Sequence, residues 1–282
     1  MSTQATTDRE DILGTAAGWL AEGETVAIAT VVETWGSSPR PPGSQLAVTG
    51  SGRMAGSVSG GCIEGAVADV ARQTMADGTQ ILHPDDVAAP ALAAAADAAL
   101  RADKAANLAL DGAEWFVNPH NPPLRLVIVG AVHVAQVLAP MAAGLGFAVT
   151  VVDPRGAFAT EERFGGGVTL RDEWPDEALE ALAPDSRTAI VTLTHDPKLD
   201  DPALEVALRG PAFYIGALGS RRTHAKRLDR LREARIHEAS FGRIAAPVGL
   251  NIGAVTAPEI ALSILAEIVA RRRGSELGGR AA

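Results

Sequence analysis

The amino-acid sequence predicts an α/β protein in which a small N-terminal α+β domain precedes a Rossmann-like domain with a doubly wound parallel sheet. The apolar run 124–129 (LRLVIV) is typical of a strand that is buried on both faces of such a sheet. Gly130 follows, and apolar residues then recur at helical spacing from Val134 to Leu145. The next strand ends at Asp153, 23 positions after Gly130, where such folds place a carboxylate that binds a ribose hydroxyl.

The glycine pattern after this strand departs from the dinucleotide-binding fingerprint. The fingerprint is G-x-G-x-x-G/A, whereas this chain has Gly130, Val132 and Ala135 at the three positions. The Val132 side chain would stand where the backbone must approach a pyrophosphate. The pattern therefore favours a Rossmann-like scaffold without NAD(P), and an NAD(P)-dependent oxidoreductase is the alternative.

Residues 1–82 are expected to form the small domain, and 83–122 an Ala-rich linker with helical content. The expected elements of the small domain are a helix at 8–22, strands at 25–33 and 44–49, a hairpin turn at 50–53, and a helix that follows GSVSGGCIEG (56–65) and runs to about residue 76.

The second domain, 123–282, continues as alternating strands and helices, the pattern of a parallel sheet. Strands are expected near 168–170, 189–193 and 212–216, and a last strand or loop around 247–249. Helices are expected at 176–182, 202–209, 221–235 and 258–273, and loops at 154–167 and 194–202. Thr256 and Glu259 have the spacing of a capping box at the start of the last helix.

Composition narrows the function classes. The net charge of −9 argues against general binding to nucleic acid or to an anionic membrane surface. Cys62 is the only cysteine, which excludes a disulfide within the chain and fits a reducing cytoplasm. The polar start MSTQATTDRED does not resemble a signal peptide, and no uncharged apolar run approaches the ~18 residues of a membrane span.

The candidate site of the N-terminal domain is centred on Cys62. It follows Gly60 and Gly61, which would let a ligand approach the backbone, and is expected in the first turn of a helix. Such a position lowers the pKa of a thiol and favours a thiolate that binds a soft metal or sulfur. A small side chain buried against a turn is the structural alternative. In the loop 37–43 (SSPRPPG), Arg40 could hold an anion, or the loop could be merely rigid.

The stretch 216–228 (GALGSRRTHAKRL) is the clearest anion-binding signal. Gly219 follows a predicted strand, Ser220 is a suitable N-cap, and Arg221 and Arg222 begin a helix. Seven Lys and Arg residues against two acids lie within 221–235. The helix start with its two arginines would reach a phosphate, and the remaining cations could form a solvated basic face.

Three further residues are expected in loops beside this edge of the sheet. His195, with Asp196, could bind a metal or polarise a ligand, or the pair could cap a turn. His133 could contact a ligand or pack within its helix, and Asn251 could line the crevice or belong to a turn.

Several long motifs in this order resemble the XdhC/CoxI family of xanthine dehydrogenase accessory proteins. They are ETWGSSPRPPGSQLAV and GSVSGGCIEG in the first domain, and RLVIVGAVHVAQ, VVDPRGAFATEERF, LTHDPKLDDPAL, YIGALGSRRTHAKR and PVGLNIGAVTAPEIALSILAEI in the second.

The resemblance implies a maturation factor and not a turnover enzyme. Family members bind molybdenum cofactor, protect it during sulfuration and pass it to a xanthine dehydrogenase-type enzyme. The implied partners are the molybdenum subunit of that enzyme and a cysteine desulfurase, and the implied oligomer is a homodimer. In this chain the crevice of the second domain would take the pterin and its phosphate, and Cys62 would contact molybdenum or its sulfur.

This chain departs from the family in one respect. Many relatives carry a second cysteine in a glycine-rich stretch before the linker, and this chain has only Cys62. Two such thiols could meet only between two copies of the chain.

An adaptor that docks the two partners without holding cofactor is a third hypothesis, and Cys62→Ser would separate it from the first.

Overall fold

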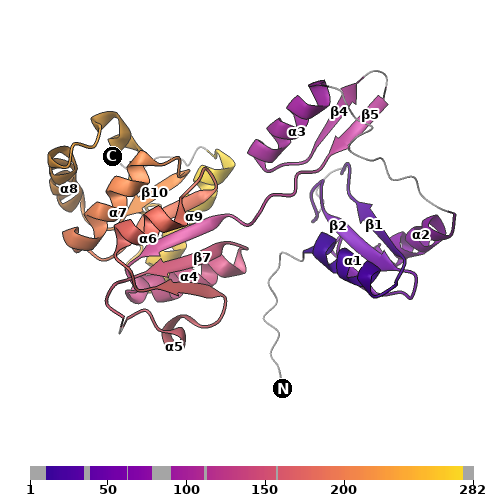
Figure 1. The fold of residues 1–282 in the computed structure, drawn as a ribbon, viewed down its shortest axis with the longest axis horizontal. Coiled ribbons are helices and arrows are strands. Elements are labelled where there is room, and N and C mark those ends of the chain that lie inside the picture. Colours follow the sequence, from indigo (N-terminus) through magenta and orange to yellow (C-terminus); the bar gives the residue numbers. More distant parts are fainter. Residues whose placement is uncertain are drawn as a thin grey trace. The chain divides into compact units, whose positions relative to one another are not determined.

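The computed structural model describes residues 11–34, 39–61, 63–77, 90–110, 113–156 and 158–275. The chain forms two compact units, Arg9–Pro122 and Pro123–Ala282 (Figure 1). An α/β protein with a small antiparallel N-terminal part and a parallel-sheet domain is thereby confirmed. The first compact unit extends to Pro122 and therefore includes the stretch 83–122 that was expected as a linker. The division into domains at residues 82 and 122 stays a prediction.

The first unit is built on an antiparallel sheet of three strands with a helix on each face. Its elements are α1 (Ile12–Ala21), β1 (Val26–Thr30), β2 (Gln45–Thr49), β3 (Met54–Gly56) and α2 (Glu64–Asp77). Because side chains alternate along β2, Ala47 packs against α1, whereas Leu46 and Val48 pack against Ala68 and Ala71 of α2.

The segment expected as a linker contains a helix and a hairpin. These are α3 (Pro90–Ala102), β4 (Ala106–Leu110) and β5 (Ala113–Val117), and β4 pairs with β5 in antiparallel register. The helix agrees with the expected helical content, whereas the hairpin was not expected. Asn118 Nδ2 donates to the carbonyl of Gly43 at 3.5 Å, which connects the end of β5 to the loop before β2.

The second unit contains a parallel sheet of six strands in the order β11-β10-β9-β6-β7-β8. The strands are β6 (Arg125–Val129), β7 (Ala148–Val152), β8 (Val168–Arg171), β9 (Thr188–Thr192), β10 (Tyr214–Ala217) and β11 (Ile244–Ala245). This is the order of the Rossmann fold, in which the chain reverses direction across the sheet between β6 and β9.

Helices cover both faces of this sheet. On one face lie α4 (His133–Gly144) and α9 (Ala257–Arg273), with Phe164 of α5 (Glu161–Phe164) packed beside them. On the other lie α6 (Pro175–Leu182), α7 (Pro197–Arg209), α8 (Arg221–Glu233) and the 3-10 helix η2 (Glu238–Arg243). Alternate residues of β6 face the two cores, which explains its nearly continuous apolar run.

Three predictions differ from the structure. The loop expected at 154–167 contains α5, and the last strand is β11 at Ile244–Ala245, before the strand or loop expected around 247–249. The third difference is the start of α7. Residues 194–202 were expected as a loop, but α7 begins at Pro197. The Asp196 side chain accepts from the backbone N–H of Lys198 at 2.9 Å, and proline is favourable in a first turn because it has no N–H to leave unpaired. At α9 the predicted capping box is confirmed, since the N–H of Thr256 donates to Glu259 at 2.8 Å.

Within the described part of the chain, every helix is too short or too polar to cross a membrane.

Candidate functional site

The loops at the carboxyl ends of the six parallel strands carry most of the predicted site residues. Gly130 follows β6, His195 lies after β9, Gly219 lies after β10, and Asn251 lies after β11. Open α/β sheets bind their ligands at this edge, beside the point where the strand order reverses. The sheet therefore brings together residues that are more than 100 positions apart.

The turn between β6 and α4 is tightly built. Gly130 has φ +106°, and a Cβ at this position would lie 2.5 Å from Cγ2 of Thr194. Only glycine fits, because the backbone conformation and the close approach of the loop after the neighbouring strand β9 both exclude a side chain. Val132 is the N-cap of α4 and supplies no side-chain cap, and His133 is the exposed first residue of the helix.

Asp153 is fully buried and fully hydrogen-bonded. Its two oxygens accept from the N–H of Ala131 at 2.8 Å, from the N–H of Arg155 at 3.0 Å, and from Nε and Nη2 of Arg155 at 2.8 and 2.7 Å. Burial alone would raise the pKa of Asp153, but the bonds from Arg155 and Ala131 outweigh it and lower the pKa. The predicted ribose contact would require Arg155 to give up these bonds, which weakens the case for a nicotinamide cofactor.

A pocket lies between the loops after β10 and β11 and the start of α9. It has a volume of about 460 Å³, and Arg221, Asn251 and Gly253 are among its lining residues. Leu218, Val248 and Ile260 contribute apolar surface to its walls. A guanidinium, an amide and apolar walls together suit a flat polar heterocycle that carries an anionic group.

A buried carboxylate that the sequence analysis missed holds this loop in place. Glu267 of α9 is 2 % exposed, and its Oε2 accepts from Tyr214 Oη at 2.7 Å and from the N–H of Gly249 at 2.8 Å. The bonds join α9, β10 and the loop after β11, whose Gly249 lines the pocket. A lone Glu within an apolar helical stretch was the only signal available.

Arg221 and Arg222, which the sequence suggested would act together, line different pockets. Arg221 lines the pocket beside α9, whereas Arg222 lines a second pocket between α7 and α8 together with His195. Successive helical residues differ in direction by about 100°, which separates neighbouring side chains. Ser220 caps α8 as predicted, accepting from the N–H of Thr223 at 3.2 Å, and Gly219 has φ +131°.

The metal site considered at His195 finds no support among the described residues, where no group of three or more metal-ligating side chains occurs. His195 is exposed and has φ +61°.

In the first unit, Cys62 and the serines of the loop 37–43 lie outside the described residues, so the predicted position of Cys62 in a helical turn is not described. The helix α2 begins at Glu64. Gly60 and Gly61 are exposed, with φ +80° and +110°. Arg40 donates from Nε to the carbonyl of Ser57 at 3.1 Å, which brings it beside the same loop.

Glu64 organises the loop around Cys62 and was not identified from the sequence. Its carboxylate accepts from the hydroxyls of Ser57 and Ser59 at 2.5 and 2.6 Å and from the N–H of Ile63 at 3.2 Å. These hydrogen bonds hold the pKa of Glu64 well below its usual range, and the bond from Ser57 has the largest effect. The carboxylate is therefore ionised at neutral pH.

A pocket of about 600 Å³ lies beside this loop. It is lined by the end of β1, by Pro39 and Val58, and by Ser59 and Ile63, which stand on either side of Cys62 in the sequence. Its lining is mainly apolar. A ligand or a peptide segment with apolar surface could therefore bind next to the glycine pair.

The fold and its loops define a class: a two-unit α/β protein whose Rossmann-type domain lacks the dinucleotide fingerprint and carries ligand pockets at the edge of its sheet. Comparison with known families gives the particular assignment. Residues 126–268 match the XdhC Rossmann domain, and residues 19–84 match the XdhC and CoxI family. The chain belongs to the XdhC/CoxI family.

Individual relatives agree with this assignment. The molybdenum cofactor insertion chaperone PaoD of Escherichia coli (strain K12) is 31 % identical over 96 % of this chain and 91 % of its own length. The uncharacterized protein YqeB of the same organism is 34 % identical over 86 % of this chain, and a probable xanthine dehydrogenase subunit of Bacillus subtilis (strain 168) is 34 % identical over 56 %. The matched parts amount to 43 % and 46 % of these two proteins, so the chain spans less than half of each.

A solved structure shares the fold. The crystal structure of a Bacillus halodurans protein described as a xanthine dehydrogenase has a TM-score of 0.65, with 20 % identity, over 95 % of this chain and 97 % of that one.

Proposed function

We propose that this protein is a maturation factor that binds molybdenum cofactor, protects it while its terminal sulfur is installed, and delivers it to a xanthine dehydrogenase-type molybdoenzyme. Family membership and the similarity to PaoD over nearly the whole chain support this proposal. The partners would be the molybdenum subunit of that enzyme and a cysteine desulfurase. The protein would act in the cytoplasm as a homodimer.

The main structural support for the proposal is that Arg221 and Asn251 line the same pocket at the edge of the sheet. The cofactor is a pterin with a phosphate and a dithiolene that holds molybdenum. Arg221 would bind the phosphate, Asn251 would pair with a polar edge of the pterin, and Ile260 with its apolar neighbours would cover the ring. The chemistry of the lining residues therefore fits the group.

The glycine loop of the first unit would act on the metal end of the cofactor. Gly60 and Gly61 are exposed, so the backbone can be approached closely, and the Glu64 carboxylate fixes the loop on which Cys62 lies. The Cys62 thiolate would contact molybdenum or its sulfur. When bound, the cofactor supplies the redox chemistry of the client, whereas the residues of this chain bind it and exclude water and oxygen.

Transfer to a client enzyme tests the proposal. The protein would be loaded anaerobically with sulfurated molybdenum cofactor, freed of excess ligand, and mixed with the apo form of a xanthine dehydrogenase-type enzyme. The expected result is activation well above that given by an equal amount of free cofactor during exposure to air. The Cys62→Ser variant should deliver less active cofactor. Activation no greater than with free cofactor would refute the delivery role.

A further inference from the structure

A buried arginine on α8 lacks the hydrogen bonds that its burial requires. Arg227 is 1 % exposed. Its Nη2 donates to the carbonyl of Leu218 at 2.8 Å, but no described group accepts a hydrogen bond from its Nε or Nη1. A charged donor that is removed from water without an acceptor is costly, so an arginine kept in this state indicates that something else supplies the acceptors.

The nearest carboxylate does not supply them. Asp200 of α7 is also 1 % exposed, and its Oδ2 lies 3.7 Å from Nη2 of Arg227, beyond hydrogen-bond distance. Its Oδ1 accepts from Thr194 Oγ1 at 2.7 Å, which turns the carboxylate toward the loop after β9, and its Oδ2 has no hydrogen-bond partner among the described groups. The ion pair is therefore loose, and both partners have unused bonding capacity.

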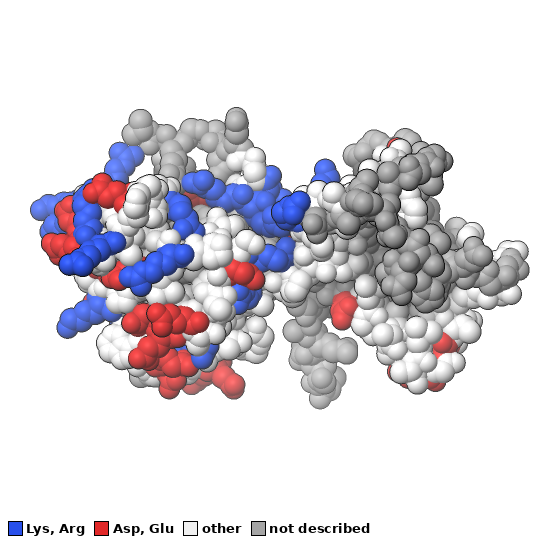
Figure 2. All heavy atoms as spheres, turned by 45° about the horizontal axis from the view of Figure 1, so that its top comes forward, with Lys and Arg blue, Asp and Glu red and all other residues white. Residues whose placement is uncertain are grey.

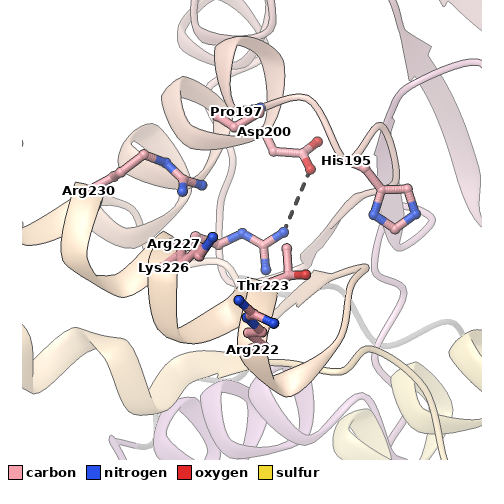
Figure 3. Close-up of a pocket in the computed structure, with 8 residues that line it drawn as sticks. All are labelled: His195, Pro197, Asp200, Arg222, Thr223, Lys226, Arg227 and Arg230. Atoms are coloured by element: carbon pink, nitrogen blue, oxygen red, sulfur yellow. Dashed lines mark ion pairs between the residues drawn. The ribbon is translucent and has the colours of Figure 1, made fainter.

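Both residues belong to the lining of one pocket. Arg227 and Asp200 line a pocket of about 360 Å³ between α7 and α8, with His195, Arg222 and Lys226 around it. Figure 3 shows the guanidinium of Arg227 facing Asp200, with Thr223 and Arg222 below Asp200 in this view. The volume exceeds the roughly 30 Å³ that one water occupies in the liquid, so a larger polar group fits the space.

The charge of the lining selects an anion. Four lining residues are permanently cationic, and Asp200 is the only carboxylate among the lining residues described. Arg230 is bound to Asp201 through Nε and Nη2, so its charge is largely compensated. Arg222 and Lys226 are exposed and make no described ion pair. In Figure 2, Lys and Arg side chains, with some Asp and Glu among them, lie over the upper part of the second unit.

We propose that the pocket between α7 and α8 binds a phosphate group. A tetrahedral phosphate presents several acceptors at once, which suits the two unpaired nitrogens of Arg227, Nε and Nη1, and the nearby cations Arg222 and Lys226. A protonated phosphate oxygen would donate to Oδ2 of Asp200. The site is separate from the pocket beside α9, because Arg221 and Arg222 line different pockets.

Burial raises the pKa of Asp200 even though the Thr194 hydrogen bond and the charge of Arg227 oppose it. The raised pKa eases protonation of Asp200, and a protonated carboxyl would donate to a phosphate oxygen.

Titration calorimetry with inorganic phosphate tests the proposal on the full chain without cofactor, at fixed ionic strength. The expected result is saturable binding of one phosphate per chain. Arg222→Gln and Lys226→Gln should each weaken it about fivefold, because each removes one cationic partner at the pocket mouth. Arg235→Gln, beyond the end of α8, removes the same charge outside the pocket and should leave the Kd within about twofold.

Two results would overturn the proposal. One is the absence of saturable binding by the wild-type chain, which would make Arg227 and Asp200 a structural ion pair. The other is an equal loss in all three variants, which would indicate diffuse attraction to the basic helix. Because both variants in the pocket change exposed residues, the test does not depend on replacing the buried Arg227.

Repeating the titration on cofactor-loaded protein identifies the source of the phosphate. An unchanged Kd would assign the pocket to free phosphate or a phosphorylated small molecule. Loss of phosphate binding on loading would assign it to the phosphate of the cofactor itself. Failure of cofactor retention with phosphate binding intact would refute the proposed function and leave this site standing.

Discussion

Substitution of Gly130 by alanine should destabilise the second unit strongly. The new Cβ would lie 2.5 Å from Cγ2 of Thr194, and the backbone at φ +106° is one that side-chain-bearing residues rarely adopt. Backbone strain of this kind costs about 1–3 kcal/mol, and forcing an extra carbon into a packed site adds a similar amount. The expected loss in free energy of unfolding is therefore about 2–5 kcal/mol.

The chain offers a matched control. Gly144 is the last residue of α4, has no atom within 4 Å of an added Cβ, and does not have positive φ. Gly144→Ala should stabilise by up to about 1 kcal/mol, because alanine loses less backbone entropy in a helix. Urea unfolding followed by circular dichroism compares the two variants. If Gly130→Ala changed the free energy of unfolding by less than about 0.5 kcal/mol, as little as Gly144→Ala, the turn would not be constrained as described.

Three further predictions concern the site. Asp153→Asn should lower the melting temperature. Because the pKa of Asp153 is lowered in the folded state, the difference from wild type should be full above the unfolded pKa of about 3.9 and should shrink as the pH falls below it; a difference that stays constant from pH 7 to pH 3 would contradict this. Arg221→Gln should weaken cofactor retention about tenfold in equilibrium gel filtration, whereas Arg273→Gln, at the far end of α9, should not; equal losses would refute a local contact. Tyr214→Phe should cost about 1.5–3 kcal/mol in thermal unfolding, because Glu267 loses a buried hydrogen bond; an unchanged melting temperature would show that the bond is dispensable.

The sequence was most informative where one local rule acted alone. The β6 strand was predictable because nearly all of its side chains enter a core, and the cap at Ser220 follows from a residue preference at one position. The β4–β5 hairpin was not predicted because the Ala-rich stretch around it shows weak alternation, although Asp111 and Gly112 between the two strands are a two-residue turn signal.

Side-chain partners across the fold could not be predicted from sequence alone. Arg227 belongs to a helix so basic that a solvated face was the natural interpretation, yet packing of α8 on α7 buries it. Glu64 carries no sequence signal of its role beside Cys62, although its carboxylate binds two serines of the loop. Asp153 was expected to face a ribose because position alone does not reveal that Arg155 already occupies it.

Direct binding tests the central claim. The purified full chain would be incubated anaerobically with molybdenum cofactor and, separately, with NAD and NADP, and passed through gel filtration before the retained pterin and nicotinamide are quantified. We predict near-stoichiometric pterin and no nicotinamide. Retention of nicotinamide without pterin would contradict the proposed function and favour an oxidoreductase, and retention of neither would favour an adaptor that does not hold cofactor.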